Sequence, residues 1–401
     1  MQNIFLRRLF LVITGSKINA GEGDKNMADY IKGVDLSAVA EVEELGAKYY
    51  DNGVQGDIFG ILKNYGVNSV RLRLWNDPYT EDGVPYGAGT NDLEVYKKLA
   101  KRAMDHGMSI LLDYHYSDFW ADPGKQRVPK AWRGMDVDQL EQAVYDYTRE
   151  TLLEMKDAGV FPQLVQVGNE LTNGLMWPLG QKPEYDNIAK FVSAGIRAVR
   201  SVDSDIPVMI HLDNGGNNPM YVDWFDNYME RGEDFDIIGM SYYPFWHGTM
   251  KELEANMRDM ADRYGKKIVI AEVSMGFTMD DYAEYEKLGP DDRKGYATKP
   301  SLVEKLDYPM TPEGQAEFMN DIMKLIDDVP GGDGFYYWEA GWIPVPGSGW
   351  ATEGALSYIE ESGPCGNEWA NQALFDYDGH ALPALKTIRD YKPLHSDYPL
   401  K

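Results

Sequence analysis

Basic residues and cysteines are both scarce in this 401-residue sequence. The chain has 39 Lys and Arg residues against 65 Asp and Glu residues, which gives a formal net charge of −26. Nucleic acids and anionic membranes attract proteins through clustered Lys and Arg, so this balance argues against both as partners. Cys365 is the one cysteine, which excludes a disulfide within the chain and a site built from several thiolate metal ligands.

Long apolar runs are also missing. Nothing in the sequence is apolar over the roughly 20 residues that a membrane-spanning helix needs, so we expect no membrane insertion. Arg7 and Arg8 precede a short apolar run at 9–13, which resembles a secretory signal, although no clear Ala-x-Ala cleavage site follows. We expect a leader or signal segment over residues 1–29, with a disordered leader as the alternative, then one domain over residues 30–401. The expected location is secreted, periplasmic or at the cell surface.

Aromatic residues, in contrast, are abundant. The sequence holds 10 Trp and 27 Tyr residues. These side chains either pack in a core or offer flat platforms on which apolar ring faces can stack. Together with the low basic content, they fit a soluble protein that acts on a neutral ligand.

Short apolar runs alternate with segments of helical period along the chain. The apolar runs predict eight strands, at residues 30–34, 69–74, 109–112, 163–167, 208–212, 237–240, 268–271 and 334–337. Between them, apolar residues such as Tyr96, Leu99 and Ala103 recur at three- and four-residue steps, as on one face of a helix. Alternating strands and helices imply parallel pairing, and eight such units close into a (β/α)8 TIM barrel. A doubly wound open sheet is the alternative, but no Gly-x-Gly-x-x-Gly pattern follows the first strand.

Each predicted strand ends in polar or aromatic residues. In a (β/α)8 barrel, functional groups gather at the C-terminal ends of the strands. The residues at these ends are Asp35, Trp75, His115, Glu170, Asp213, Tyr242, Glu272 and Trp338. Long loops follow strands 3, 7 and 8, and long loops in a compact domain are usually functional or disordered.

Two of these strand ends carry glutamates. Glu170 ends strand four and Glu272 ends strand seven, which lie nearly opposite each other in an eight-stranded barrel. The alternative for Glu170 is a surface residue that starts the next helix. Two carboxyl groups about 5–5.5 Å apart can cleave a glycosidic bond with retention, one as the proton donor and the other as the nucleophile. Glu339 is a third candidate, which we interpret as a supporting carboxylate.

Other side chains near these ends can orient the two carboxyl groups. Arg71 and Arg73 share one face of a strand with Trp75, so they are two buried cations that need carboxylate partners. Arg71, Arg73, Tyr242 and Tyr243 can supply hydrogen bonds to an ionised nucleophile. Asn169 can donate a hydrogen bond to a sugar 2-hydroxyl group.

The sequence resembles glycoside hydrolase family 53, the arabinogalactan endo-β-1,4-galactanases, over about residues 32–383. The matching segments are 32–37 (KGVDLS), 70–78 (VRLRLWNDP), 113–123 (DYHYSDFWADP), 166–170 (QVGNE), 239–246 (GMSYYPFW) and 271–272 (AE). The resemblance implies a retaining endo-acting hydrolase that cleaves β-1,4-galactan, the neutral side chain of pectin. It also implies Glu170 as the acid/base, Glu272 as the nucleophile and Trp338 as a sugar platform.

The strand ends and the matching segments together predict a set of substrate-binding residues. These are Asp35, Arg71, Arg73, Trp75, His115, Asp118, Trp120, Asn169, Asp213, Tyr242, Tyr243 and Trp338. We expect a neutral galactan polysaccharide or oligosaccharide as the partner and a monomeric protein.

The sequence also departs from the family pattern at two places. The family often has Trp-Glu-Pro at the eighth strand, whereas Ala340 and Gly341 follow Glu339 here. Some bacterial members bind calcium through an Asp-x-Asp-x-His-x-Asn run after the seventh strand, which this sequence lacks. Acidic residues in that loop could hold a hard cation, but spaced acids on a loop are usually solvated, so we predict no metal and no cofactor; the residues concerned are Asp280, Asp281, Asp291 and Asp292.

Two other functions compete with the galactanase interpretation. One is a related retaining β-1,4-glycanase, such as a mannanase or a cellulase, because the residues alone do not choose galactose over glucose or mannose. The other is a glycan-binding barrel without turnover. A binding barrel of this kind is expected to have lost one of the two carboxylates, and both are present.

Overall fold

Eight parallel strands form a closed barrel in the computed structural model, which describes residues 30–282, 296–363 and 365–394. The order around the barrel is β1-β10-β9-β8-β7-β6-β5-β4, and β4 pairs with β1 to close it. The barrel strands are β1 Ile31–Asp35, β4 Ser69–Leu74, β5 Ser109–Tyr114, β6 Leu164–Val167, β7 Val208–Leu212, β8 Ile237–Tyr242, β9 Lys267–Val273 and β10 Gly332–Tyr337. This arrangement confirms the predicted (β/α)8 barrel and excludes the open sheet.

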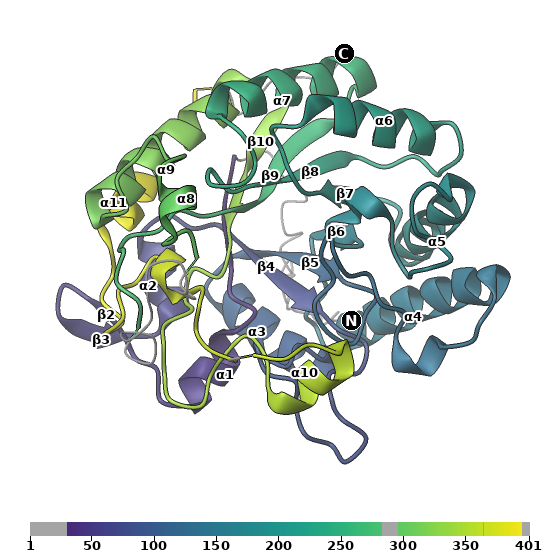
Figure 1. The fold of residues 1–401 in the computed structure, drawn as a ribbon, viewed down its shortest axis with the longest axis horizontal. Coiled ribbons are helices and arrows are strands. Elements are labelled where there is room, and N and C mark those ends of the chain that lie inside the picture. Colours follow the sequence, from purple (N-terminus) through teal and green to yellow (C-terminus); the bar gives the residue numbers. More distant parts are fainter. Residues whose placement is uncertain (1–29, 283–295, 364, 395–401) are drawn as a thin grey trace, which may run out of the picture.

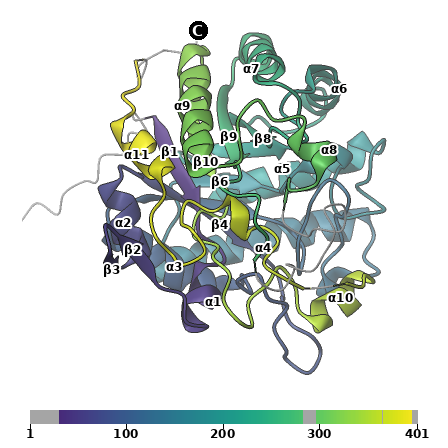
Figure 2. The ribbon, with the colours of Figure 1, turned by 60° about the vertical axis from the view of Figure 1, so that its left-hand side comes forward.

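Helices surround the barrel and connect successive strands (Figures 1 and 2). The helices that alternate with the strands are α2 Ile58–Asn64, α3 Leu93–Asp105, α4 Val137–Asp157, α5 Tyr185–Val202, α6 Asn218–Met229, α7 Met250–Tyr264, α9 Pro312–Asp328 and α11 Pro383–Asp390. Shorter elements lie in the connections: α1 Val39–Glu44, α8 Pro300–Val303, α10 Glu353–Ile359, and the 3₁₀ helices η1 Lys130–Trp132, η2 Leu171–Asn173 and η4 Ala370–Gln372. A hairpin of β2 Tyr49–Asp51 and β3 Val54–Gly56 precedes α2 and was not predicted.

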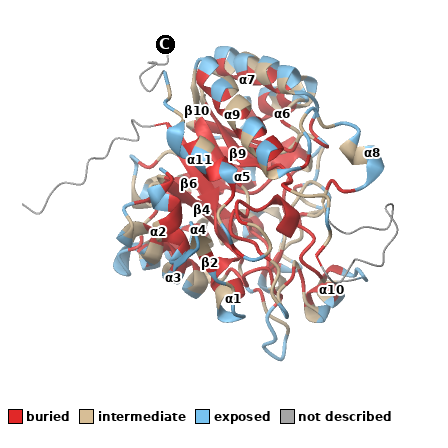
Figure 3. Ribbon diagram, turned by 90° about the vertical axis from the view of Figure 1, so that its left-hand side faces the viewer, coloured by how far each residue is buried: buried red, intermediate tan, exposed pale blue. Residues whose placement is uncertain are grey.

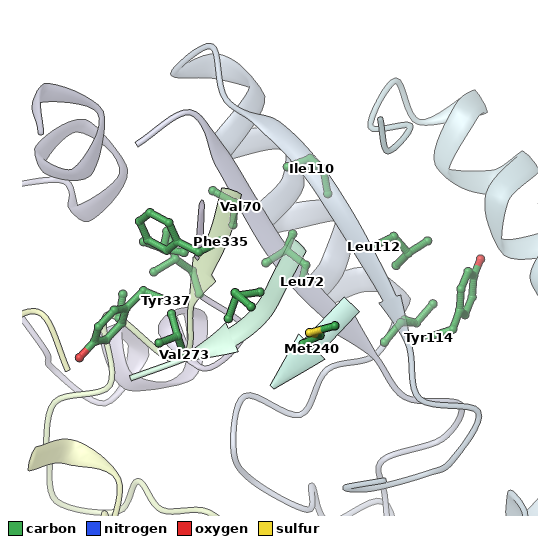
Figure 4. Close-up of a cluster of buried hydrophobic side chains, with 14 of the residues drawn as sticks. Val70, Leu72, Ile110, Leu112, Tyr114, Met240, Val273, Phe335 and Tyr337 are labelled. Atoms are coloured by element: carbon green, nitrogen blue, oxygen red, sulfur yellow. The ribbon is translucent and has the colours of Figure 1, made fainter. Parts of the chain in front are cut away.

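Alternation along each strand divides the side chains into an outer core and an inner layer. On β4, Val70 and Leu72 point outward, where the helices cover them, while Arg71 and Arg73 point into the barrel. Figure 4 shows part of the outer core, contributed by several neighbouring strands. The inner layer contains a small apolar cluster of Ile31, Leu111, Leu164, Met209, Ile237, Val269, Ala271 and Tyr336.

The helices pack on this outer core through one face each. Figure 3 shows buried residues along the barrel and exposed residues on the outer sides of the helices. Helix α3 buries Tyr96, Leu99 and Ala103, as the sequence period predicted. Its first turn is capped by Asp92, whose carboxylate accepts from the Val95 backbone N–H at 2.8 Å, an interaction typically worth about 1 kcal/mol.

Long connections extend beyond the C-terminal ends of the strands, as the sequence indicated. They follow β5, β9 and β10, and part of the connection after β9 lies outside the described residues. Among the helices that the structure describes, none combines the length and the apolar character required to cross a membrane.

Candidate active site

Glu170 reaches the mouth of the barrel through a sharp turn at the end of β6. Gly168 has φ +82° and Glu170 has φ +48°, so the chain leaves the strand direction directly after Val167. A Cβ atom on Gly168 would lie 2.7 Å from the side chain of Leu171, which explains the glycine. A left-handed conformation at a glutamate costs about 1–2 kcal/mol, and such local strain often positions a functional group.

Glu272 is aimed into the barrel by an irregularity in β9. The register between β8 and β9 shifts after Met240, so that Ser241 pairs with Glu272. Ala271 belongs to the inner apolar cluster, and Glu272 also points inward, where it contacts Arg71. Regular alternation would have sent one of these consecutive residues outward, so the irregularity re-aims the glutamate.

The carboxyl groups of Glu170 and Glu272 meet across the barrel mouth. One oxygen atom of each lies within 4.8 Å of the other. Glu272 Oε1 lies 2.9 Å from Arg71 Nη2, and its Oε2 accepts from the Tyr243 hydroxyl at 2.7 Å. Glu170 Oε1 lies 2.6 Å from the Ser241 hydroxyl. Glu272 therefore has a cation and a phenol as partners, whereas Glu170 has one neutral hydroxyl.

These surroundings separate the proton affinities of the two groups. Burial raises the pKa of Glu170 well above its ordinary value, and the negative charges of Glu272 and Asp213 raise it further. Burial also raises the pKa of Glu272, but Arg71 and Tyr243 oppose that rise. Two carboxyl groups this close do not both ionise readily. The surroundings therefore favour the proton on Glu170 and the negative charge on Glu272.

Arg71 lies at the centre of a buried network beneath the two glutamates. It donates to Asp35 Oδ2 at 3.0 Å, to Asp113 Oδ2 at 2.8 Å and to Asn169 Oδ1 at 2.8 Å. Burial alone would lower the pKa of Arg71, but Asp113, Glu272 and Asp35 together raise it. A buried guanidinium without such partners would cost several kcal/mol, so these carboxylates keep Arg71 charged beside Glu272.

Arg73 forms a second buried ion pair that does not involve the two central glutamates. Its Nη1 contacts Glu339 Oε1 and its Nη2 donates to the Ala88 carbonyl at 2.6 Å. The guanidinium also lies 4.2 Å from the ring centre of Trp120. Burial raises the pKa of Glu339 to about 7, against the opposing charge of Arg73. Glu339 thus supports Arg73 and Trp120, in line with its interpretation as a supporting carboxylate.

An open pocket of about 610 Å³ lies above the two glutamates. Its walls carry many aromatic side chains, contributed mainly by the loops after β5, β8 and β10: Trp120, Tyr243, Trp246, Tyr296, Trp338, Trp342, Trp350 and Trp369. Trp338 meets Trp369 edge to face, with ring centres 4.3 Å apart. Such rings offer broad apolar faces for a ligand, and both catalytic candidates form part of the same pocket.

Comparison with known proteins agrees with this geometry. Residues 31–388 match the model of glycosyl hydrolase family 53. The chain belongs to glycosyl hydrolase family 53. It is 38% identical to an endo-beta-1,4-galactanase of Bacillus subtilis, over 90% of this chain and 86% of the relative. The solved catalytic domain of a family 53 protein from Ignisphaera aggregans superposes with a TM-score of 0.81 at 41% identity, covering 90% of this chain and 96% of that one.

A solved structure described as one of two fungal beta-1,4-galactanases is also similar. It superposes with a TM-score of 0.72 at 30% identity, over 90% of this chain and 98% of that chain. As a member of family 53, the chain is a glycoside hydrolase, and the alternative of a glycan-binding barrel without turnover is not favoured.

The structure brings most of the predicted site residues of this family 53 chain to the pocket. The predicted residues that line it are His115, Trp120, Asn169, Glu170, Asp213, Tyr243, Glu272 and Trp338. Asp35, Arg71 and Arg73 do not line the pocket but lie under its floor. Asp35 pairs there with Arg71, Arg71 contacts Glu272, and Arg73 pairs with Glu339. They act on a ligand only through these neighbours.

Three predicted substrate-binding residues lie elsewhere. Trp75 is fully buried and donates through Nε1 to His115 Nδ1 at 3.2 Å. Asp118 is buried and accepts from the backbone N–H groups of Asp77 and Lys130, at 3.1 and 2.6 Å, so it orders the loop after β5.

Tyr242 is the third, and its placement corrects its predicted role as a donor to the nucleophile. It points to the opposite face from its neighbour Tyr243 and donates to the Gly248 carbonyl at 3.1 Å. Arg73 is likewise paired with Glu339 rather than with Glu272.

Sequence reasoning missed several residues of the site. Ser241, His211 and Gln166 are buried polar residues on inward positions of β8, β7 and β6, and strand alternation could have identified them. The remaining lining residues come from loops, whose folding no local pattern predicts; they include Asp122, Lys125, Trp246, His247, Tyr296, Trp342, Trp350, Glu361, Glu368 and Trp369.

Within the described residues, one group of side chains has the spacing of a metal site. Glu170, His211 and Glu272 each offer a ligand atom within 4.8 Å of the others. However, His211 Nδ1 lies 2.9 Å from Asn169 Oδ1, and its Nε2 lies 2.9 Å from Ser241 Oγ. Because both ring nitrogens already have hydrogen-bond partners, we interpret the group as a carboxyl pair with a supporting imidazole. Of the loop acids considered for calcium, Asp291 and Asp292 lie outside the described residues.

Proposed function

We propose that the chain is a retaining endo-β-1,4-galactanase in which Glu170 is the acid/base and Glu272 the nucleophile. The observation that carries this proposal is the pair of carboxyl groups, with oxygens within 4.8 Å of each other in one open pocket. Retaining glycosidases place their carboxyl groups about 5–5.5 Å apart, whereas inverting enzymes need about 6.5–9.5 Å to fit a water molecule. The short separation supports direct attack by a carboxylate.

The first step uses the different charges of the two groups. Glu272 attacks the anomeric carbon, and the bond from that carbon to the bridging oxygen breaks. Glu170 gives its proton to this oxygen, which leaves as the hydroxyl group of the departing chain. Arg71 and Tyr243 hold Glu272 ionised and oriented before the attack. The product of this step is a covalent ester between Glu272 and the sugar.

The second step reverses the roles. Glu170 is now a carboxylate and takes a proton from water, whose oxygen attacks the anomeric carbon. The ester bond breaks, Glu272 is released as a carboxylate, and Glu170 is again protonated. Two inversions give net retention of the anomeric configuration. The transferred sugar therefore ends with the β-configuration at its new reducing end.

The walls of the pocket support a neutral polysaccharide as the substrate. The lining contains one lysine, Lys125, which lies 3.1 Å from Glu361. The carboxyl groups of the lining are more numerous: Asp122, Glu170, Asp213, Glu272, Glu361 and Glu368. A polymer of uronic acids would meet like charges here, whereas the neutral galactan side chains of pectin would not. The choice of galactan itself follows the names of the similar proteins.

The same proposal places the enzyme outside the cytoplasm. A polysaccharide is too large to enter a cell intact, and the charged and apolar residues at 7–13 resemble a secretory signal. The proposal includes a monomeric enzyme, for which the two carboxyl groups and the pocket walls of one chain are sufficient.

One experiment tests this function directly. Purified protein is incubated with linear β-1,4-galactan, β-1,4-mannan and carboxymethyl-cellulose, while product size and anomeric form are followed over time. We expect galactan to fall quickly to oligosaccharides of several lengths, with the β-anomer appearing first. Cleavage of mannan or cellulose in preference to galactan would transfer the assignment to another β-glycanase, and initial α-anomer would exclude retention.

A further inference from the structure

Two buried polar residues outside the proposed mechanism connect Glu170 to the charged floor of the pocket. The Ser241 hydroxyl oxygen lies 2.6 Å from Glu170 Oε1 and 2.9 Å from His211 Nε2. Ser241 lies on the inner face of β8 and His211 on the inner face of β7, and both side chains are fully buried. These contacts form a hydrogen-bond chain from the carboxyl group of Glu170, through Ser241, to the imidazole of His211.

The far end of this chain determines which imidazole nitrogen carries the hydrogen. His211 Nδ1 lies 2.9 Å from Asn169 Oδ1. The orientation of the Asn169 amide is determined by two other contacts, because its Oδ1 accepts from Arg71 Nη2 at 2.8 Å and its Nδ2 donates to the Ala121 carbonyl at 2.9 Å. An amide oxygen can only accept. Gln166 Nε2 also lies 3.1 Å from Nδ1, but its two hydrogens have partners in Asp113 Oδ1 at 2.6 Å and the Gly168 carbonyl at 3.0 Å. The hydrogen of a neutral His211 therefore resides on Nδ1, which leaves Nε2 as an acceptor.

His211 is neutral at ordinary pH. Burial lowers the pKa of His211 well below its usual value, and the charge of Arg71 lowers it further. Its Nε2 can then accept from the Ser241 hydroxyl. That hydroxyl has a single hydrogen and two neighbours, Nε2 of His211 and Oε1 of Glu170. When the hydrogen points to His211, the hydroxyl oxygen can only accept from a protonated Glu170; when Glu170 is ionised, the hydrogen turns toward it.

We propose that Ser241 and His211 are positioning residues that serve both protonation states of Glu170 through this single hydroxyl hydrogen. The hydrogen points at His211 while Glu170 is the acid, and at Glu170 while it is the base. Only a hydroxyl rotation is needed, and the proton that Glu170 exchanges with substrate or water is the only one transferred. This inference rests on the proposed acid/base role of Glu170.

The two residues therefore act on Glu170 in opposite directions. Ser241 stabilises the carboxylate by donating to it. His211 competes for the same hydrogen and so favours the acid. Removing each residue in turn should shift the proton affinity of Glu170 in opposite senses, which a purely structural role would not do.

Other charged and titratable groups surround this hydrogen-bond chain, and substitution of Ser241 or His211 leaves them in place. Glu170 is faced by Glu272 of β9, by Asp213 after β7, by Asp122 in the loop after β5 and by Tyr243 after β8. His211 is faced by Arg71 of β4, Asp113 and His115 at the end of β5, and His247 after β8. They set the baseline from which both shifts are measured.

The test compares the pH dependence of kcat/KM for Ser241→Ala and His211→Phe on a galacto-oligosaccharide. The alkaline limb of this profile reports the proton of the acid/base group. We expect it to move to higher pH in Ser241→Ala and to lower pH in His211→Phe, each by about one pH unit. Ser193→Ala is the matched control, because Ser193 is a buried serine on α5 that accepts from the Glu233 backbone N–H at 2.9 Å, away from the pocket. Shifts in the same direction, or none, would overturn the proposal.

A second measurement needs no variant and no activity. The ¹⁵N chemical shifts of the His211 ring in the intact protein report which nitrogen is protonated. We expect the hydrogen on Nδ1 at and around neutral pH. A hydrogen on Nε2 would refute the proposed directions of the hydrogen bonds between His211, Ser241 and Glu170. Failure of the acid/base assignment is recognised separately, since a Glu170→Ala variant would then keep its activity on poor leaving groups while the tautomer result stands.

Discussion

The hydroxyl of Tyr243 donates a hydrogen bond of 2.7 Å to Oε2 of Glu272, while its neighbour Tyr242 donates to a backbone carbonyl on the opposite side of the strand. Both tyrosines are buried and consecutive in the sequence. Only one of them touches the proposed nucleophile. The chain thus contains its own comparison between a phenol that supports the chemistry and one that supports the fold.

Replacing Tyr243 by Phe should therefore reduce activity much more than replacing Tyr242 by Phe. Loss of a preorganised donor typically costs about 10²-fold in kcat, and we expect a loss of that order for Tyr243→Phe. The hydrogen bond from Tyr243 also lowers the pKa of Glu272, so its acidic limb in the kcat/KM profile should move to higher pH. The Tyr242→Phe variant should keep kcat and the profile nearly unchanged; equal losses in the two variants would contradict the assigned contacts.

Glu272→Gln should abolish turnover and keep galactan binding. The amide has the shape of the carboxylate but cannot form the ester, and removal of a nucleophile in other hydrolases costs about 10⁶-fold in kcat. Binding depends mainly on the pocket walls, which the substitution leaves in place. Calorimetry with galacto-oligosaccharides and an overnight turnover assay would check both parts. A variant that retained near-normal kcat would remove Glu272 from the mechanism.

Azide should distinguish the roles of the two glutamates. In Glu170→Ala, an aryl galactoside with a good leaving group still forms the ester with Glu272, because no proton donor is needed. The small azide anion then occupies the space left by the side chain and attacks the ester without a general base, so the product is the β-galactosyl azide. The matched Glu272→Ala variant should instead give the α-azide, because attack then occurs once and from the other face. NMR of the products decides, and the same anomer from both variants would refute the assignment.

The barrel and its two glutamates could be predicted because their signals are local. The body of β6 is a short apolar run, and Glu170 follows it after Gly168 and Asn169. Glu272 likewise follows the short apolar run at 268–271, although β9 itself continues to Val273. The parallel barrel then places both strand ends at one mouth. Arg71 was predicted to contact the nucleophile, and it contacts Glu272. Its other carboxylate partners were predicted only as a class, because which of them face Arg71 depends on register across several strands.

The walls of the pocket were predicted less well, for physical reasons. Trp246, Trp350 and Trp369 lie on loops, and a loop is positioned by contacts distant in sequence rather than by its own period. Trp75 and Tyr242 were predicted to bind substrate because each lies at the end of a strand, but neither side chain points into the pocket. The alternation of side chains predicts which face a residue occupies within a strand, but it does not apply beyond the end of the strand.

A last prediction concerns the loss of folding stability that results from burying Glu170. Burial and nearby negative charges raise the pKa of Glu170 far above its value in an unfolded chain. Between those two pKa values, the folded state binds a proton that the unfolded state has released. The stability that this proton contributes is fully present below the unfolded pKa of about 4.3 and is lost as the pH rises through the folded pKa. Each pH unit in that window removes about 1.4 kcal/mol from the free energy of unfolding.

Glu170→Gln should therefore be more stable than the wild type at alkaline pH, because the amide remains neutral at any pH. The two proteins should differ little near pH 4, and the stability gain of the variant should grow toward pH 8. Urea unfolding at several pH values measures the difference. Glu141→Gln is the control for the same substitution outside the pocket, since Glu141 is a partly exposed residue of α4 that pairs with Arg197. If the gain of Glu170→Gln were constant with pH, the carboxyl would not be the proton-holding member of the pair, and Glu272 would have to take that role.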